Sequence, residues 1–368
     1  MKIAIVSDAY YPHYSGVTEY AHGLATYLKK FGHSVDIITG SYGECDRIYP
    51  AIRIGKVISL PALGSFATLP IGFDVPQKMR TILKSKRYDV IHLNGPFFPN
   101  LSFFAMKYAN CPVVATFHTA SEYNPILLAY LYRLIFGEYY KNLSLKIAVS
   151  NHALETYKPF IPGEYTIIPN GVDSERFTPY GEKIEWMQKI PTILFVGRLD
   201  KRKGLHRLLN TLPLVVKKKK VLLVVVGKGP LYKDYLNMVK KLHLEQFVKF
   251  VGRVSEKDLP KYYRSARVYT SPALGNESFG IVLLEAMASG TPVVASNIKG
   301  YNEVIEHEKT GLLVDTSDKI RYSEALVRLL EDDELRKKLI DNALEAINQK
   351  YSWACVTKAI LAHYNKII

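Results

Sequence analysis

The sequence predicts an α/β protein with two domains, each built around a mainly parallel β-sheet that is covered by helices. Short apolar runs alternate with helical patterns along the whole 368-residue chain, and this alternation is interrupted once near the middle. Strands that alternate with helices favour parallel sheets, because each crossover helix returns the chain to the same end of the sheet. The chain is long enough for two such domains.

The first set of strands is expected in five short apolar runs. Runs of this length, rich in Val and Ile, indicate strands that are buried on both faces. Helical patterns lie between them, for example at residues 17–31 and 100–109. The runs occupy residues 3–6, 35–39, 90–93, 113–117 and 147–149.

A break over residues 170–191 separates the two sets of strands. This segment is rich in Pro, Gly and charge and has little periodicity, which is typical of a linker. The second set is expected at 192–196, 221–226, 248–251, 268–270 and 292–295, and a last helix at about 353–367. We therefore expect two Rossmann-like domains, over residues 1–175 and 176–352, with a ligand cleft at the carboxyl ends of the strands.

The composition indicates a soluble globular protein with an anionic partner. Hydrophobic residues make up 48% of the chain and charged residues 23%, and the net charge is +15. That charge suits nucleotide phosphates or anionic lipid headgroups, whereas nucleic acid is not expected because no aromatic-and-basic motif accompanies it. Three widely spaced cysteines (Cys45, Cys111 and Cys355), with no apolar leader, predict a cytoplasmic protein with reduced thiols. Any membrane contact is expected to be peripheral.

The segment 276–311 carries the strongest chemical signal. Glu277 and Glu285 are eight positions apart, and between them the chain turns from a loop into a helix. The backbone N–H groups at this turn have no partner within the helix, so together with the helix dipole they offer an anion site. Gly280 lets an anion approach the backbone closely. A diphosphate-linked sugar fits such a site, whose turn residues are Ser278, Phe279, Gly280 and Ile281. The alternative is an ordinary apolar helix whose acids lie on its polar face.

A second candidate site is the basic segment at residues 197–204, which follows a strand and opens a helix. Arg198 and Lys203 lie in a βα loop, where cations can bind a pyrophosphate and stabilise the charge that grows as it leaves. Lys201 and Arg202 are expected to be solvated surface residues.

Three positions in the first half are further candidates. Gly16 precedes a helix and would let a phosphate approach its start, although a turn role is the alternative. His118 follows a strand at the expected cleft, where a neutral imidazole can both donate and accept, or it is a structural histidine. Asn170, at the start of the linker, either reaches the cleft or is structural.

Residues 75–88 form a basic segment with an apolar stripe. Its cations are Lys78, Arg80, Lys84, Lys86 and Arg87, and Met79, Ile82 and Leu83 form the stripe. Such a helix either lies on an anionic membrane or simply covers the sheet. Residues 61–73 before it are expected to form an apolar loop that is buried or accompanies a lipid acceptor.

Taken together, these motifs resemble the retaining glycosyltransferases of family 4, which have the GT-B fold. The resemblance rests on E-x₇-E followed by ASGTPVVAS and GLLV, and on VVATFHT, IAVS and IPNGVD. Within the family the chain is most similar to the phosphatidyl-myo-inositol mannosyltransferases. The resemblance implies two Rossmann-like domains facing across a cleft, the first for the acceptor and the second for the donor, with the C-terminal helix crossing back to the first.

The resemblance also implies roles for the candidate residues. Glu277 and His118 would contact the transferred sugar, and Glu285 the ribose. Arg198 and Lys203 would bind the diphosphate, beside Gly16 and the 278–281 backbone, and the loop that contains Val254 would contact the base. The donor would be GDP-mannose or a UDP-sugar, the acceptor a lipid-linked inositol or a small polyol, and no metal is implied.

The mechanism and the reaction class stay open at this level. Retention of the anomeric configuration proceeds either through a covalent carboxylate intermediate or by same-face attack, which we favour because no second carboxylate is placed as a nucleophile. A sugar-nucleotide epimerase or a phosphorylase is the second class, although no pyridoxal-binding lysine site is recognisable. A non-catalytic nucleotide- or lipid-binding module is the third.

Overall fold

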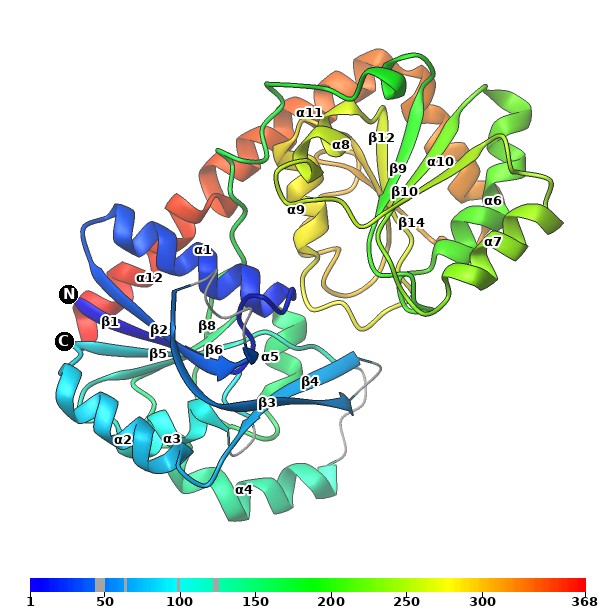
Figure 1. Cartoon of the computed structure of the whole chain (residues 1–368). Helices are drawn as coiled ribbons and strands as arrows, with labels where there is room; N and C mark the ends of the chain where they lie inside the picture. The colour runs from blue at the N-terminus through cyan, green and yellow to red at the C-terminus, as the bar shows by residue number, and fades with distance from the viewer. Residues whose placement is uncertain (44–49, 63–64, 98–99, 122–125) are drawn as a thin grey trace. The chain divides into compact units, whose positions relative to one another are not determined.

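A computed structural model of the chain divides into two compact units (Figure 1). Unit 1 comprises Met1–Gly171 and Trp353–Ile368, and unit 2 comprises Val172–Ser352. The structure describes residues 1–43, 50–62, 65–97, 100–121 and 126–368, with the backbone alone at 59–62, 65–68 and 126. Cys45 therefore lies outside the described residues, and Cys111 and Cys355 form no disulfide with any described residue.

Unit 1 contains an eight-stranded sheet in the order β4-β3-β2-β1-β5-β6-β7-β8. Every neighbouring pair runs parallel except β3 and β4. All five strands expected in this half are present, within two residues at each end. The strands are β1 (Lys2–Ser7), β2 (Ser34–Ser41), β3 (Ile52–Ala62), β4 (Ser65–Ile71), β5 (Val90–Asn94), β6 (Val113–Phe117), β7 (Leu145–Ala148) and β8 (Thr166–Ile167).

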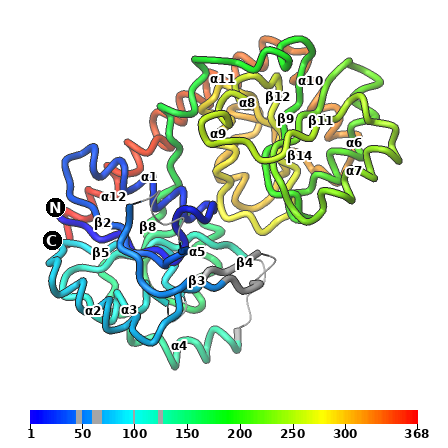
Figure 2. Tube along the Cα trace, in the orientation of Figure 1, coloured from blue at the N-terminus to red at the C-terminus, as the bar shows by residue number. Residues whose placement is uncertain are grey.

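Helices cover both faces of this sheet (Figure 1). Side chains alternate across a strand, so Ile3 and Ile5 of β1 pack with α1 and α12, whereas Ala4 and Val6 pack with α2, α3, α4 and α5. The chain trace in Figure 2 shows the C-terminal helix α12 beside α1, so the last helix crosses back to the first domain as expected. The helices are α1 (Gly16–Lys30), α2 (Val75–Lys86), α3 (Leu101–Tyr108), α4 (Ile126–Tyr140), α5 (Asn151–Tyr157) and α12 (Trp353–Ile367).

The expected apolar loop at 61–73 is wrong, because β3 and β4 form an antiparallel pair through most of it. Residues 63 and 64, which connect the two strands, lie outside the described residues. Pro61 and Pro70 within the two strands hid the pairing, since proline argues against a strand in a sequence pattern. After β4 the chain is open to solvent, and Phe73 is fully exposed.

Unit 2 contains a six-stranded, fully parallel sheet in the order β11-β10-β9-β12-β13-β14. Five of these strands were expected, and the sixth, β14, lies in the GLLV motif. The strands are β9 (Thr192–Val196), β10 (Leu222–Val226), β11 (Val248–Gly252), β12 (Val268–Ser271), β13 (Val293–Ser296) and β14 (Leu312–Val314). The linker before β9 contains one short 3₁₀ turn, Glu185–Gln188.

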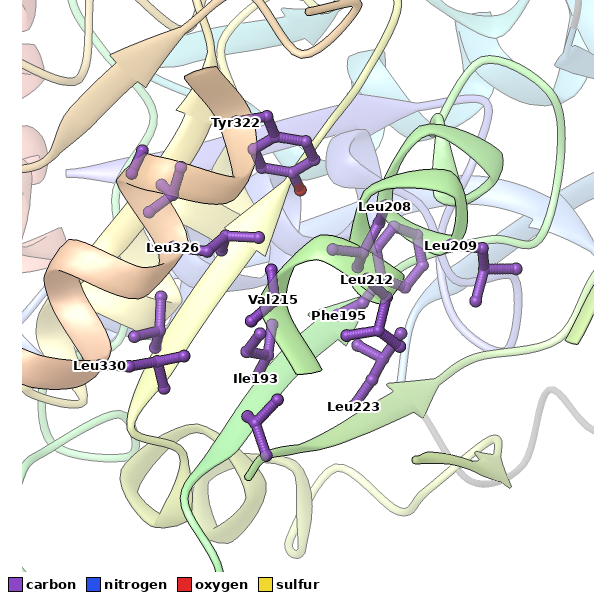
Figure 3. Close-up of a cluster of buried hydrophobic side chains, with 14 of the residues drawn as sticks. Ile193, Phe195, Leu208, Leu209, Leu212, Val215, Leu223, Tyr322, Leu326 and Leu330 are labelled. Carbon is purple, nitrogen blue, oxygen red and sulfur yellow. The ribbon is translucent and has the colours of Figure 1, made fainter. Parts of the chain in front are cut away.

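The core of unit 2 lies mainly between this sheet and helices α6 and α10, which pack against each other (Figure 3). Ile193 and Phe195 of β9 meet Leu208 and Leu212 of α6 there, all at most 1% exposed. The helices are α6 (Leu205–Lys218), α7 (Tyr232–Lys241), α8 (Leu259–Ser265), α9 (Ile281–Ala288), α10 (Lys319–Glu331) and α11 (Asp333–Ala346), with a π-helical turn at Ile347–Tyr351. Within the described part of the chain, no helix is long and apolar enough to cross a bilayer.

Candidate active site

The order of the strands in unit 2 selects one place for a ligand. Strands β9 and β12 are neighbours, but the chain continues from β9 to β10 on one side and from β12 to β13 on the other. Loops therefore diverge at the carboxyl ends of β9 and β12, which is where open parallel sheets bind ligands. These two loops, residues 197–204 and 272–280, contain the basic segment and Glu277.

Two glycines allow close backbone contacts around these loops. Gly204 lets the two loops touch, because a Cβ there would lie 1.9 Å from the Pro272 carbonyl oxygen. Gly300, which follows β13, packs against the second loop, because a Cβ there would lie 2.1 Å from the Glu277 carbonyl oxygen. Both glycines also have positive φ angles, 70° and 84°. The position of Glu277 thus depends on residues with no side chain.

Replacing Gly204 with alanine should destabilise unit 2, because the new methyl group meets backbone that cannot move away. We expect a loss of about 2–5 kcal/mol in the free energy of unfolding, from the left-handed backbone and the steric clash together. Chemical denaturation followed by tryptophan fluorescence measures this loss. Gly32→Ala is the matched control, since Gly32 also has a positive φ but nothing within 4 Å of its Cβ position; equal losses in the two variants would contradict the clash.

Glu277 is the central charged group of this site. Its residue is 7% exposed, and its Oε1 accepts hydrogen bonds from Lys203 Nζ at 2.7 Å and Arg202 Nη1 at 2.6 Å. A buried carboxylate requires such partners. The expectation that Arg202 is a solvated surface residue is therefore wrong, whereas Lys201 is exposed as expected.

Arg198 lies at the exposed edge of the same loop. Its Nε is 3.7 Å from Asp200 Oδ2, and Asp200 Oδ1 accepts the backbone N–H of Lys203 at 3.1 Å. Asp200 thus orients the loop so that Lys203 reaches Glu277. Within the two loops, the three cations Arg198, Arg202 and Lys203 face the carboxylates of Asp200 and Glu277, so this group of side chains carries one net positive charge that suits an anion.

Glu285 projects from α9 and is bound by a neighbouring helix. Its Oε2 accepts the hydroxyl of Tyr263, in α8, at 2.7 Å. Burial, and next the charge of Glu285, raise the pKa of Tyr263, so this hydroxyl stays protonated and remains a donor. The carboxylate is partly exposed and so can bind a ligand as well.

The start of α9 corrects one expectation about Gly280. This residue caps the helix with φ 99°, but the space beside it is filled, because a Cβ there would lie 2.7 Å from the ring of Tyr301. Gly280 is thus required by packing against Tyr301 and not by the approach of an anion to that side. Phe279 is buried against Tyr351, while Ser278 and Ile281 are partly exposed. Val254, two residues beyond β11, is also partly exposed.

His118 of unit 1 directly follows β6 and is 8% exposed. Its Nε2 donates to Asn94 Oδ1, at the end of β5, at 2.9 Å, and its ring meets the Tyr20 ring edge-on at 4.5 Å. Burial lowers the pKa of His118 to about 3. The imidazole is therefore neutral at physiological pH and can bind a ligand hydroxyl without carrying charge.

The stability of the protein should depend on the pH through His118. The pKa of His118 in the folded chain, about 3, lies below the ordinary value of 6.5. Between these two pH values the histidine is therefore protonated in the unfolded chain but neutral in the folded chain. The stability is therefore fully present above pH 6.5 and falls as the pH drops toward 3. We expect His118→Gln to reduce the slope of unfolding free energy against pH, measured near pH 5, by about 1.4 kcal/mol per unit. An unchanged slope would contradict a buried neutral imidazole.

Other predicted residues of unit 1 lie at helix starts or at the end of the unit. Gly16 begins α1, whose cap is Ser15, with its side chain accepting the Thr18 N–H at 3.2 Å. Asn170 is 5% exposed, and its Oδ1 is buried with no hydrogen-bond partner among the described residues. The orphaned acceptor is consistent with either a ligand contact or a structural role.

Helix α2 carries the predicted basic cluster on its solvent side. Lys78, Arg80, Lys84, Lys86 and Arg87 are all exposed. Lys78 pairs with Asp74 at 2.6 Å and Lys86 lies 3.5 Å from Asp36. The apolar stripe of this helix faces the core, since Met79 and Leu83 are at most 1% exposed. The membrane-facing interpretation of that stripe is therefore wrong, although the cations remain available.

Comparisons with known proteins decide the family. The model described as Glycosyltransferase Family 4 matches residues 14–176, and the one described as Glycosyl transferases group 1 matches residues 179–346. The chain is 33% identical over 369 residues to phosphatidyl-myo-inositol mannosyltransferase of Mycolicibacterium smegmatis, covering 100% of this chain and 94% of that protein. The chain belongs to the family 4 glycosyltransferases.

Two more distant proteins are also similar to this glycosyltransferase, one in sequence and one in structure. The GPI3 subunit of phosphatidylinositol N-acetylglucosaminyltransferase from Saccharomyces cerevisiae is 26% identical, over 100% of this chain and 83% of that protein. The crystal structure of Anabaena HepE in complex with UDP and glucose has a TM-score of 0.77 at 19% identity and covers 100% of both chains. That likeness shows the GT-B fold.

In each unit the structure brings polar residues next to the predicted candidates that the sequence reasoning missed. Arg202 was predicted to be a solvated surface residue, because a run of charged residues is usually exposed to solvent. Asn94 and Tyr263 lie far from their partners in sequence and match no motif. Asp8, which directly follows β1, was also missed. Burial raises the pKa of its carboxyl group to about 8, although hydrogen bonds from the Leu101 N–H and the Asn100 amide lower it. A polar residue that ends or directly follows a buried strand is the signal that finds Asn94 and Asp8.

Proposed function

We propose that this glycosyltransferase transfers mannose from GDP-mannose to an inositol lipid at the inner face of a membrane, with retention of the anomeric configuration. The observation that carries the proposal is the full-length match to a phosphatidyl-myo-inositol mannosyltransferase. The GPI3 relative also names a phosphatidylinositol acceptor, with a different sugar. The acceptor class thus has support from two relatives, while the sugar has support from one.

The geometry of unit 2 supports the donor part of this proposal. Three cations and a helix start gather at the carboxyl edge of the sheet, which suits a diphosphate. We assign Arg198 and Lys203 to the diphosphate, beside the 278–281 backbone, and Glu285 to the ribose. We also assign Arg202 to the diphosphate, because its contact with Glu277 puts it beside Lys203.

Glu277 is proposed to bind the sugar hydroxyls. Its Oε1 is already engaged by Lys203 and Arg202, and a carboxylate stabilised by two cations is a weak nucleophile. This supports same-face attack, in which the leaving phosphate takes the proton of the acceptor, over a covalent intermediate on Glu277. From the family resemblance we add His118, Gly16 and the loop of Val254 as donor contacts, and for Asn170 we keep both a ligand contact and a structural role.

A panel of donors tests the proposal. Turnover of GDP-mannose, UDP-glucose, UDP-galactose and UDP-N-acetylglucosamine is measured with and without phosphatidylinositol vesicles, by released nucleotide and product mass. We expect GDP-mannose turnover that rises with the vesicles and adds a hexose to the lipid. Turnover of a UDP-sugar instead would show that the proposed donor is wrong. A response only to soluble polyols would show that the proposed acceptor is wrong. Nucleotide release with an altered sugar and no acceptor would indicate an epimerase.

The basic side of α2 is proposed to attract the anionic membrane. Arg80 and Lys84 are exposed and have no ion pair in the described part of the chain. Arg80→Gln/Lys84→Gln should weaken binding to phosphatidylglycerol-containing vesicles about 30-fold, from about 1 kcal/mol per surface cation. Sedimentation with vesicles measures this. The control Lys217→Gln/Lys218→Gln removes two exposed charges from unit 2, and an equal loss there would show that only total charge matters.

A further inference from the structure

Helix α4 of unit 1 is apolar on both of its sides. One side packs into the core through Ala129, Tyr132 and Tyr140, each at most 9% exposed. A helix that covers a sheet ordinarily carries polar residues on its other side. Here the other side, called the outer face of α4, consists of Leu127, Leu128, Tyr130, Leu131, Leu134 and Ile135, whose exposed fractions run from 46% to 72%. Packing against the described residues of unit 1 does not account for this face.

We infer that the outer face of α4 inserts into the headgroup boundary of an anionic bilayer. The helix has 15 residues and is therefore roughly 22 Å long, too short to cross a hydrocarbon core of about 30 Å. It is suited instead to lie in the plane of the membrane, with leucines below the headgroups and Tyr130 among them.

The charges around the helix match an anionic surface. Arg133 lies on the exposed side and has no ion pair among the described residues. The single acid of the helix, Glu138, is neutralised by Lys141. A groove of about 390 Å³ lies beside the helix, and its wall joins apolar Leu134 and Ile161 to cationic Arg133 and Lys146, besides the paired Glu138 and Lys141. An anionic phospholipid presents the complementary pair, an acyl chain next to a phosphate.

A second copy of the chain is a poorer occupant of this face. In a twofold interface each surface meets itself, so the cations around the helix would face their own copies. Like charges opposed across an interface cost free energy, and the whole chain already carries a charge of +15. The same cations favour a lipid surface.

The outer face of α4 complements α2, and the opposite side of α4 is linked to the loop that follows Asn94. Both helices pack on the same face of the sheet, α2 offering exposed cations and α4 exposed apolar groups. The core side of α4 is tied to the loop after β5, since Tyr132 and Tyr140 donate to the carbonyl oxygens of Phe97 and Pro96 at 2.5 and 2.6 Å. That loop follows Asn94, the partner of His118. The inference thus deepens the proposed function, on which it rests for a membrane-held acceptor.

A tryptophan probe tests the insertion directly. Leu134→Trp is mixed with phosphatidylcholine vesicles with and without phosphatidylglycerol, made with brominated acyl chains. We expect a blue shift and quenching of its added fluorescence only with the anionic vesicles. Ile320→Trp is the matched control, because Ile320 is similarly exposed (58% against 65%) but lies on α10 of unit 2. Quenching of both variants, or of neither, would overturn the inference.

A loss-of-binding variant gives the second measurement. Leu131→Gln/Leu134→Gln should bind anionic vesicles about a hundredfold more weakly, since each of the two inserted leucines contributes about a tenfold gain, while nucleotide binding in solution is unchanged. Ile320→Gln is the control. Unchanged vesicle binding, or a concentration-dependent dimer that the substitutions abolish, would overturn the inference. If the transfer assay excludes an inositol lipid as the acceptor but the Leu134→Trp probe is still quenched, the proposed acceptor is wrong and the membrane insertion of the outer face of α4 is confirmed.

Discussion

Glu277→Gln should lose most sugar transfer while nucleotide binding stays within a few-fold of the wild type. The side chain keeps its size, but the full negative charge that two cations approach within 2.7 Å is removed. If Glu277 binds the sugar at the reacting centre, its charge acts mainly in the transition state, so kcat falls more than affinity. We expect a loss of about a hundredfold to a thousandfold in kcat. Transfer assays with parallel calorimetry of GDP binding separate the two effects.

Glu306→Gln is the matched control for that substitution. Glu306 also pairs with a lysine, Lys309 at 2.7 Å, but both side chains are more than 60% exposed. Such surface pairs contribute little, so the control should transfer sugar at the wild-type rate. Full activity of Glu277→Gln would remove Glu277 from the site, and a parallel loss of folding, detected by its melting temperature, would assign it a structural role instead.

Lys203→Met should weaken the binding of nucleoside diphosphates and lower kcat/KM by about a hundredfold or more. Methionine keeps much of the side-chain volume and removes the cation, so the proposed diphosphate site loses the charge that stabilises the leaving group. Binding of the free nucleoside should change little, because the base and ribose contacts are intact. Lys201→Met is the control, since Lys201 lies in the same loop but is exposed; equal effects would assign the loss to overall charge.

The double variant Glu277→Gln/Lys203→Met tests the contact itself. Residues that are hydrogen-bonded to each other act as a unit, so their effects are not additive. We expect the kcat/KM of the double variant to be little lower than that of the less active single variant. Strict additivity of the two losses in kcat/KM would show that the 2.7 Å contact has no part in the reaction.

Local sequence was sufficient for most of the strands and for the position of both site loops. Buried parallel strands are continuous apolar runs, so the pattern predicts β6 and β9 to the residue. Residues that directly follow such runs must lie at the carboxyl edge of the sheet, which is why Arg198, Lys203 and His118 were correctly placed after strands. The β3–β4 hairpin escaped this reasoning, because prolines mask its strands and its pairing joins two segments across a turn.

What the sequence determined by itself was the alternation of strands and helices, the break in that alternation over residues 170–191 and the residue types gathered after each strand. These follow from local periodicity and from short-range steric preferences. Only the tertiary structure decided that Arg202 reaches Glu277, that Gly280 accommodates Tyr301, and that the apolar stripe of α2 is buried while that of α4 is exposed. The physical reason is that a pattern of apolar residues fixes which face of a helix is apolar, but not which surface that face meets. That choice depends on neighbours that are distant in the chain.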